Sequence, residues 1–402
     1  MSANRARFIP DLLETHFEEL EYLWGQRRNA LTSAHLSLRN FIDLNDRVES
    51  HIQGLLAVRP YLPKFLAQRL DEEGRDGVFA AACPLLRLSD ESITAKVLEI
   101  FATAQGQRLT GLGDAFSFSP AGLFAPSLRK ILKQGESAQA VAAAVVLANQ
   151  NLLDPATPRL MALLEDENPD LAVLAWLAIS LCDPANIATA PVRPYKQGLL
   201  HDSPKVRSAA WKAAVWTGQA WVLPSLRKVA QQGEPIALNW LVAIGIPEDL
   251  PQISGLVVAM ESKIDACVLL ARYGHPKVLD LIGKWMVGDD IVLASAAGDA
   301  FERLTGVDIR GLRKTVPVAE DADVFQREFA PDVWLPDMNK AKVYWQQHKQ
   351  ILAGGTRWRR GVDLGGQCTL QTLTDIDLEA RWDAYARAAL TGKPLAAPPP
   401  IY

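Results

Sequence analysis

The chain of 402 residues has few of the side chains on which metal sites and disulfide frameworks depend. Its four cysteines are Cys83, Cys182, Cys267 and Cys368. They form no paired spacing, which argues against a disulfide framework or a zinc knuckle and favours reduced, buried thiols. The six histidines are also scattered. His16 and Glu19 lie one helical turn apart and could form one edge of a metal site, but a solvated helix face is the better interpretation. We expect no metal.

Catalytic signatures are missing as well. The sequence contains no phosphate-binding loop of the P-loop type, no His-Glu-x-x-His and no Gly-x-Ser-x-Gly. Gly111-Leu112-Gly113 is half of a dinucleotide fingerprint, but no strand is predicted before it, so a plain loop is the better interpretation. We therefore expect no catalytic residues, no cofactor and no enzymatic activity.

Long hydrophobic runs and a strong charge of either sign are missing too. The longest apolar run, 140–148, is far too short to span a bilayer. Acidic residues, not an apolar segment, follow the two arginines at the N-terminus, so no signal peptide is expected. The formal charge of −4 argues mildly against a nucleic-acid binder. We expect a cytoplasmic protein that contacts no membrane, and we do not expect nucleic acid as its partner.

What the sequence does contain is a repeat of 35 residues. Asn168-Pro169-Asp170-Leu171 and Ser203-Pro204-Lys205-Val206 each open an apolar helix that carries a tryptophan, Trp176 or Trp211, seven residues after the proline. A small polar residue followed by proline is typical of a helix N-terminus. Recurrence at this period without strand signals predicts stacked helical hairpins, that is, an all-α solenoid.

Helical hairpins follow one another along much of the chain. The predicted pairs are 126–134 with 138–149, 157–164 with 169–181, 194–200 with 204–217, 224–231 with 236–244, 251–261 with 265–273, and 278–287 with 291–304. Before them, we expect a helix over 77–83 that ends at Pro84, a helix over 91–104, and a glycine-rich loop over 105–119. The expected domains are an N-terminal helical cap (1–73), the repeat array (74–310), and a linker with a C-terminal capping segment (311–402).

The C-terminal segment differs in texture from the repeats. An acidic linker is expected over 316–323, then helices over 340–352 and 376–390, and an extended proline-rich tail from Pro394. The segment either caps the open end of the array or binds a partner. Capping is the simpler interpretation, because an uncapped terminal repeat exposes its apolar face.

A family resemblance adds to this interpretation. The start Asp202 to Arg207 and the ending Ala300 to Gly306 resemble HEAT repeats. A poorly characterised bacterial HEAT-repeat family is similar in the stretches His16 to Trp24 and Leu44 to Val48, together with Trp334-Leu335-Pro336, Gly355-Thr356-Arg357-Trp358 and Gly361. Some members of that family are encoded in type VI secretion clusters. The resemblance implies a HEAT-like scaffold associated with secreted effectors, and it assigns no site residue.

Two sets of residues are candidates for partner binding. Trp176, Trp211 and Trp240 could line a concave face as aromatic anchors, or they could pack against the adjacent hairpin. Glu165, Glu167 and Asp202 belong to acidic clusters that could attract a basic partner, although helix N-termini and solvated turns explain most such clusters.

Three functions are compatible with these features. The first is an immunity protein that binds and neutralises a basic secreted toxin, as the family resemblance implies. The second is an adaptor or chaperone that holds an effector for loading onto the secretion spike. The third is a HEAT-like alkylpurine DNA glycosylase, with the tryptophans and an acid such as Asp170 as its site, against which the negative charge argues.

Overall fold

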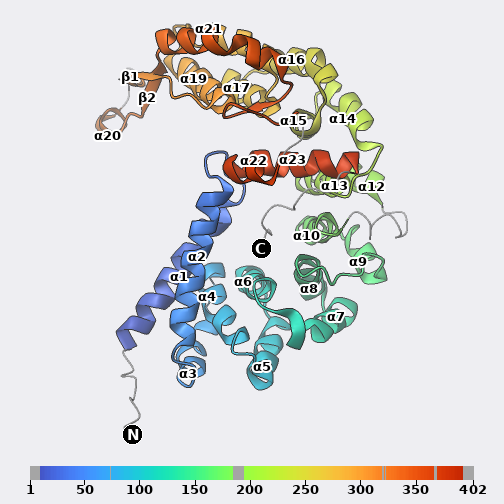
Figure 1. Ribbon diagram of the computed structural model, residues 1–402. Coiled ribbons are helices and arrows are strands. Elements are labelled where there is room, and N and C mark those ends of the chain that lie inside the picture. The colour runs from blue at the N-terminus through green and yellow to red at the C-terminus, as the bar shows by residue number, and fades with distance from the viewer. Residues whose placement is uncertain are drawn as a thin grey trace. The chain divides into compact units, whose positions relative to one another are not determined.

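The computed structural model describes residues 10–72, 74–183, 194–318, 321, 323–365 and 369–392, most of which are helical (Figure 1). The prediction of a mostly helical chain is confirmed. Contacts divide the chain into two compact units, the first formed by Met1–Gln219 with Asp377–Tyr402 and the second by Ala220–Ile376. The three domains expected from the sequence are continuous segments, whereas the first of these units combines two separate parts of the chain. The three-domain division stays a prediction. Within the described residues, every helix is too short or too polar to cross a membrane.

The first unit consists of helices. They are α1 (Pro10–Ala30), α2 (Leu38–Leu56), α3 (Leu62–Leu66), η1 (Arg69–Asp71), α4 (Arg75–Leu86), α5 (Glu91–Phe101), α6 (Gly106–Ser117), η2 (Ala121–Leu123), α7 (Ala125–Gln134), α8 (Ser137–Asn149), α9 (Pro158–Leu163), α10 (Pro169–Ser180), α12 (Tyr195–Leu200), α13 (Pro204–Trp216) and α23 (Leu378–Thr391).

The second unit adds short strands to its helices. Its elements are α14 (Val222–Gln231), α15 (Pro235–Ile244), η3 (Pro247–Asp249), α16 (Leu250–Ala259), α17 (Lys263–Tyr273), η4 (Pro276–Val278), α18 (Leu279–Trp285), α19 (Ile291–Thr305), β1 (Arg310–Thr315), α20 (Val324–Glu328), β2 (Asp332–Pro336), α21 (Met338–Gly354), β3 (Trp358–Arg359), β4 (Val362–Asp363) and α22 (Leu370–Asp375). β1 pairs with β2 and β3 with β4, both antiparallel.

The helix starts predicted for the two copies of the 35-residue repeat are confirmed. α10 begins at Pro169, where the Asn168 side chain accepts a hydrogen bond from the Asp170 N–H at 3.0 Å. α13 begins at Pro204 in the same way, although Ser203 makes no side-chain cap. Proline is suited to this place because the first N–H groups of a helix have no partner inside the helix. All six predicted helical pairs are present, with ends that differ by a few residues.

Two local predictions were wrong. The segment 105–119 is not a loop, because it forms α6. A Cβ at Gly111 would collide with the carbonyl oxygen of Arg75 and lie 3.0 Å from the Cβ of Val78, so this glycine permits a close approach of α4. Close packing thus outweighs the low helix propensity of glycine. The other error concerns α4, which was expected to end at Pro84. It continues through Pro84 to Leu86, and all of its residues from Gly77 onward are buried.

The cysteines that the structure describes are buried thiols, as the sequence predicts. They are Cys83, Cys182 and Cys267. Burial raises the pKa of the Cys83 thiol to about 11 and that of the Cys267 thiol to about 12, so both stay protonated at neutral pH. Cys368 and the proline-rich tail expected from Pro394 lie outside the described residues.

In the first unit, alternate helices form a ladder. α4 packs against α6, α6 against α8, α8 against α10, and α10 against α13. The intervening helices α7 and α9 pack against the ladder at α8. The buried faces of the ladder are rich in alanine, as in α8, where Ala140, Ala143 and Ala144 are fully buried. Small side chains let helices approach closely.

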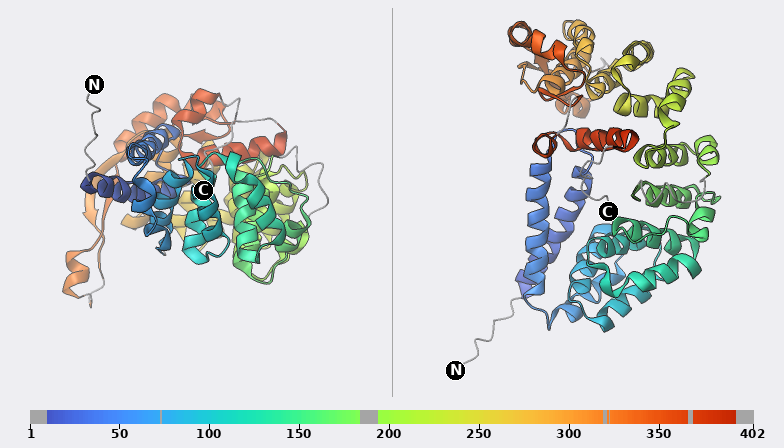
Figure 2. Two further views of the ribbon diagram at one scale, coloured as in Figure 1. Left: turned by 90° about the horizontal axis from the view of Figure 1, so that it is seen from below. Right: turned by 45° about the vertical axis from the view of Figure 1, so that its right-hand side comes forward.

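The helix α23 bridges α13, the last helix of this ladder, and the hairpin of α1 and α2, which packs on α4 at the other end (Figure 2, right). At one end, the indole of Trp382 stacks on that of Trp216 with ring centres 4.8 Å apart. At the other end, the indole Nε1 of Trp382 donates a hydrogen bond of 2.7 Å to the carbonyl of Leu31, which directly follows α1. Leu378 packs into an apolar cluster with Leu31 and Phe41, and its N–H donates to the carbonyl of Leu36 at 2.9 Å. The first unit is therefore a closed arrangement of helices, completed by the C-terminal helix.

The contacts between α1 and α2 include a pair of histidines. Nδ1 of His16 lies 3.1 Å from Nδ1 of His51, and the two rings meet edge to face. One nitrogen must donate and the other accept, so the pair cannot keep this bond with both rings doubly protonated. Burial, followed by the charge of His16, lowers the pKa of His51 below its ordinary value.

We expect Trp382→Ala to lower the free energy of unfolding of the first unit by about 3–5 kcal/mol, the usual cost of deleting a buried indole. Both the stack on Trp216 and the hydrogen bond to Leu31 are lost. Urea denaturation measures the change. The control is Tyr22→Ala, which removes an exposed aromatic side chain from α1. Equal destabilisation by both substitutions would contradict the closing role of α23.

We expect the histidine pair to make stability depend on pH. Because the pKa of His51 is lower in the folded than in the unfolded chain, the unfolded state binds the proton more readily, and stability falls as the pH falls below about 6.5. Thermal unfolding from pH 8 to pH 5 of the wild type, of His51→Gln and of the exposed-site control His35→Gln measures this. Only His51→Gln should flatten the profile, and unchanged slopes in all three would refute the expectation.

Candidate functional site

Two of the three candidate tryptophans are core residues. Trp176 in α10 is fully buried, with its ring centre 5.2 Å from that of Tyr195, and a Cβ at Gly198 would lie 2.8 Å from its ring. Trp211 in α13 is 3% exposed. In both cases the packing interpretation describes the structure, because a buried ring offers no surface to a partner. Trp240 is half-buried in α15 of the second unit, and its role in binding stays a prediction.

The three candidate acids are at the surface. Glu165 and Glu167 are exposed in the turn before α10, and Asp202 is exposed in the turn before α13. Since α10 and α13 pack side by side, these turns belong to successive steps of the ladder. Asp170, considered above as a catalytic acid, is exposed and lies 3.6 Å from the ammonium of Lys205. The structure does not bring Asp170 and the buried Trp176 to a common surface.

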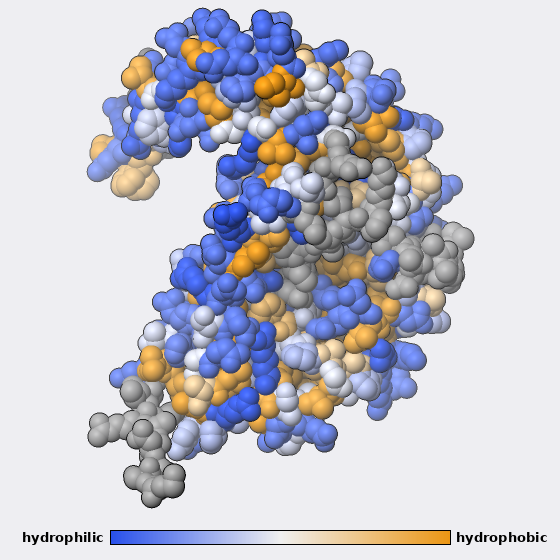
Figure 3. All heavy atoms as spheres, viewed as in Figure 1, coloured by the Kyte–Doolittle hydropathy of each residue, from blue (hydrophilic) through white to orange (hydrophobic). Residues whose placement is uncertain are grey.

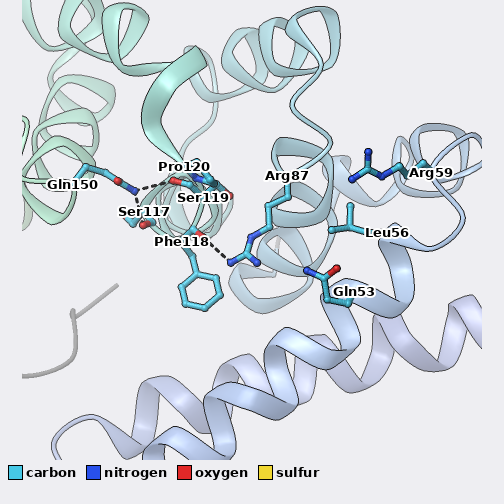
Figure 4. Close-up of a pocket in the computed structure, with 9 residues that line it drawn as sticks. All are labelled: Gln53, Leu56, Arg59, Arg87, Ser117, Phe118, Ser119, Pro120 and Gln150. Atoms are coloured by element: carbon cyan, nitrogen blue, oxygen red, sulfur yellow. Dashed lines mark hydrogen bonds between the residues drawn. The ribbon is translucent and has the colours of Figure 1, made fainter.

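A pocket with a volume of about 570 Å³ lies in the first unit (Figure 4). Its walls come from α2 and from the C-terminal ends of α4, α6 and α8. The lining residues are Gln53, Leu56, Arg59, Arg87, Ser117, Phe118, Ser119, Pro120 and Gln150. Helix C-termini leave carbonyl groups unpaired, so hydrogen-bond donors are expected beside them.

Arg87 and Gln150 supply these donors. The Arg87 guanidinium donates to the Phe118 carbonyl at 2.9 Å and forms an ion pair with Glu49 at 2.5 Å. The Gln150 amide donates to the carbonyls of Ser117 and Ser119 at 2.7 and 2.9 Å (Figure 4). Arg87 and Gln150 therefore hold the C-terminal end of α6.

The carboxylate beside the pocket is not poised for acid–base chemistry. Burial raises the pKa of Glu49, but hydrogen bonds from Gln53 and Arg87 and the charge of Arg87 more than offset this and leave the pKa below its usual value. A general base works best with a pKa near the working pH. The arrangement thus favours a structural role for this pocket.

The second unit contains a short segment, residues 355–361, that caps the ends of helices. From here on it is called the capping segment, and it is only a small part of the C-terminal segment 311–402. Arg357 is buried, and its guanidinium donates to the carbonyls of Val242, Ala243 and Gly245 at 2.6–3.2 Å, at the C-terminal end of α15. It also lies 5.1 Å from the ring centre of Tyr273. Cations are favourable at helix C-termini because the carbonyls there carry partial negative charge.

The same capping segment meets two further helix ends. The N–H of Trp358 donates to the carbonyl of Gly274, just after α17, at 2.7 Å. The N–H groups of Arg360 and Gly361 donate to the carbonyls of Arg303 and Leu304 at the end of α19. Gly274 has a φ of 74°, and a Cβ there would lie only 2.7 Å from the carbonyl oxygen of Trp358, so glycine is required at this position. The Gly-Thr-Arg-Trp pattern of the sequence thus serves to cap helices.

A projecting arm, formed by β1, α20 and β2 with the described residues between them, carries several exposed large apolar side chains, among them the three most exposed ones described in the second unit (Figures 1 and 3). Their exposed fractions are Leu312 73%, Val324 80%, Phe325 67%, Phe329 63% and Trp334 45%. The rings of Phe325 and Phe329 contact each other, with centres 4.5 Å apart. Large apolar residues gathered at the surface indicate an interaction site.

Sequence reasoning missed this arm. It predicted an acidic linker over 316–323, which lies between the two strands, and it named no strand on either side of that linker. The signal was present in Val333-Trp334-Leu335, a run of β-branched, aromatic and aliphatic residues ended by Pro336. Its partner β1 has no such run, because it carries three cations in six residues.

Comparison of the chain with family models, with curated proteins and with solved structures found no match.

We expect Arg357→Met to lower the free energy of unfolding of the second unit by roughly 2–4 kcal/mol, because three buried carbonyls lose their donor. Chemical denaturation monitored by hydrogen exchange in α15 measures the loss. The matched control is Arg360→Met, since Arg360 is exposed and caps α19 through its backbone N–H. A similar loss in both variants would show that the guanidinium of Arg357 is not the cap.

Proposed function

We propose that this protein is a helical scaffold that binds another protein, and that the projecting arm is part of the binding surface. The observation that carries the proposal is the exposure of Phe325, Phe329 and Trp334 together with two aliphatic side chains of the same arm. Leaving them in water costs free energy that burial against a partner recovers, about 25 cal/mol for each Å² of apolar surface. Aromatic residues are also the side chains most enriched in binding hot spots.

The charge of the chain supports a protein partner over nucleic acid. The whole chain has a formal charge of −4, whereas nucleic-acid binders use many lysines and arginines to neutralise phosphates. Apolar side chains are suited to the core of a protein interface. No observation favours the DNA glycosylase alternative.

A finer proposal combines the helix ladder with the family resemblance. Consecutive hairpins with alternate helices in contact support a HEAT-like α-solenoid, a fold that works mainly as an extended binding surface. The resemblance supports a cytoplasmic immunity protein that neutralises a secreted toxin. An adaptor that loads an effector is the alternative. An immunity protein rescues cells from its toxin by itself, whereas an adaptor changes export without rescue.

We expect the double variant Phe325→Ser/Phe329→Ser to lose its protein partner. Both side chains are exposed, so the fold should be unchanged, while loss of two aromatic anchors should weaken binding at least about thirtyfold, or 2 kcal/mol. Affinity purification of the tagged chain from its host, followed by quantitative mass spectrometry, measures the recovery of a stoichiometric partner.

The matched control is Ile264→Ser/Val268→Ser, which removes two exposed apolar side chains from α17 in the same unit. Wild type and control should retain the same partner. Retention by the double arm variant at the wild-type level, or no stoichiometric protein with any variant, would contradict the proposal. If a toxin-like partner is recovered, co-expression with it then separates immunity from adaptor function by survival of the cells.

A further inference from the structure

The strand β1 has one paired edge and one open edge. It forms a two-stranded sheet with β2, in which Thr315 is opposite Asp332 and Arg313 is opposite Trp334. Within the described part of the chain, β2 is the element that packs along β1. An unpaired strand edge presents N–H and C=O groups that can pair with another chain.

The register identifies which backbone groups are available. The N–H of Val316 donates to the carbonyl of Pro331 at 2.8 Å, so the pair of Thr315 and Asp332 is of the non-hydrogen-bonded type. Because the pattern alternates, the N–H and C=O groups of Arg313 and Thr315 are directed to the open edge. No described residue forms a hydrogen bond with these four groups.

The charge on β1 is of one sign. Arg310, Arg313 and Lys314 are exposed, and the strand contains no acid. Arg310 pairs with Asp308 and Arg313 with Asp332, both at the surface. The ammonium of Lys314 has no ion-pair partner among the described residues. The open edge is therefore suited to a strand that brings negative charge.

A second copy of this chain pairs poorly with the edge in the registers that use the outward groups of Arg313. The outward N–H and C=O groups of Arg313 can pair with those of Arg313 or of Thr315 in an antiparallel second copy. The two strands are then related by an axis at residue 313 or at residue 314. The first register places Arg313 opposite Arg313 of the second copy, and the other places Lys314 opposite Lys314. Like charges directly opposite each other destabilise a strand pair.

We propose that β1 binds an extended, acidic segment of a partner protein as a third strand of the sheet. This inference rests on the proposed function and names the chemistry of the partner. Successive residues of a strand point to opposite faces, so neighbouring acidic residues of the segment would meet Arg313 on one face and Lys314 on the other. Flanking β-branched or aromatic residues of the segment would pack on Leu312 of β1, which is 73% exposed.

The test selects peptides from a displayed library of random dodecapeptides on the full-length protein. The selected peptides should be enriched in neighbouring acidic residues among β-branched or aromatic ones. They should bind at least tenfold more weakly to Thr315→Pro, which removes an outward N–H while leaving the backbone hydrogen bonds to β2. Proline is tolerated at an edge whose N–H faces solvent.

Two matched controls isolate the causes. Thr315→Val keeps the outward N–H but removes the hydroxyl that donates to Asp332, and it should bind like the wild type. Lys314→Glu should weaken binding at least tenfold, whereas Lys130→Glu, the same charge change at an exposed position in α7, should leave it unchanged. In the wild type, bound peptide should slow hydrogen exchange at the amides of residues 313 and 315.

The inference is overturned if selection enriches no peptide or peptides without acidic residues. It is also overturned if Thr315→Pro binds as well as Thr315→Val, or if the two amides gain no protection. These outcomes leave the proposed function standing whenever a stoichiometric partner is still lost with Phe325→Ser/Phe329→Ser. Conversely, if Phe325→Ser/Phe329→Ser retains its partner while the selected peptides bind as expected, recognition lies at the strand edge and not at these two rings.

Discussion

The first unit depends on the contacts of α23 with α13, at one end of the ladder, and with the hairpin of α1 and α2, which packs on α4 at the other. One indole, Trp382, stacks on Trp216 and donates a hydrogen bond to Leu31, residues that lie far apart in the sequence. Such a contact closes a long loop, and the entropic cost of closure rises only slowly with loop length. The rate of folding is more sensitive, because contacts distant in sequence form late. The contacts that close the first unit therefore form only after the C-terminal helix is available.

The second unit solves a related problem with a different kind of contact. Its helices α15, α17 and α19 end at one capping segment, in which Arg357 uses its guanidinium and Arg360 its backbone N–H. Terminal carbonyls of helices must find donors when water is excluded. One segment that serves three helix ends also fixes their relative positions. In both units, residues after Gly355 thus stabilise helices that come before them.

Local chemistry allowed the helices to be predicted from the sequence. Prolines such as Pro169 and Pro204 mark helix starts because their effect is felt within a few residues. The failures have a common origin in contacts between distant residues. Gly111 lies within a helix because α4 approaches it, and Trp176 is buried because α12 covers it. The arm was missed because β1 is a strand only through its pairing with β2, while its own residues are basic and exposed.

The way buried polar groups are used narrows the search for function. Asp114 is an example, since burial raises its pKa while the charge and hydrogen bonds of Arg75 oppose the shift. Perturbed carboxyl groups often mark active sites. Here, however, both oxygens of Asp114 accept hydrogen bonds from Arg75, and Trp24 donates to one of them, so the group ties α6 to α4 and α1. Arg87, Gln150 and Arg357 are likewise committed to helix ends. The apolar rings of Phe325 and Phe329 and the outward N–H and C=O groups of β1 have no such internal role. Recognition of a protein segment is the chemistry that apolar rings and an open strand edge support together, and this is why the arm, and not a pocket, is the best candidate for function.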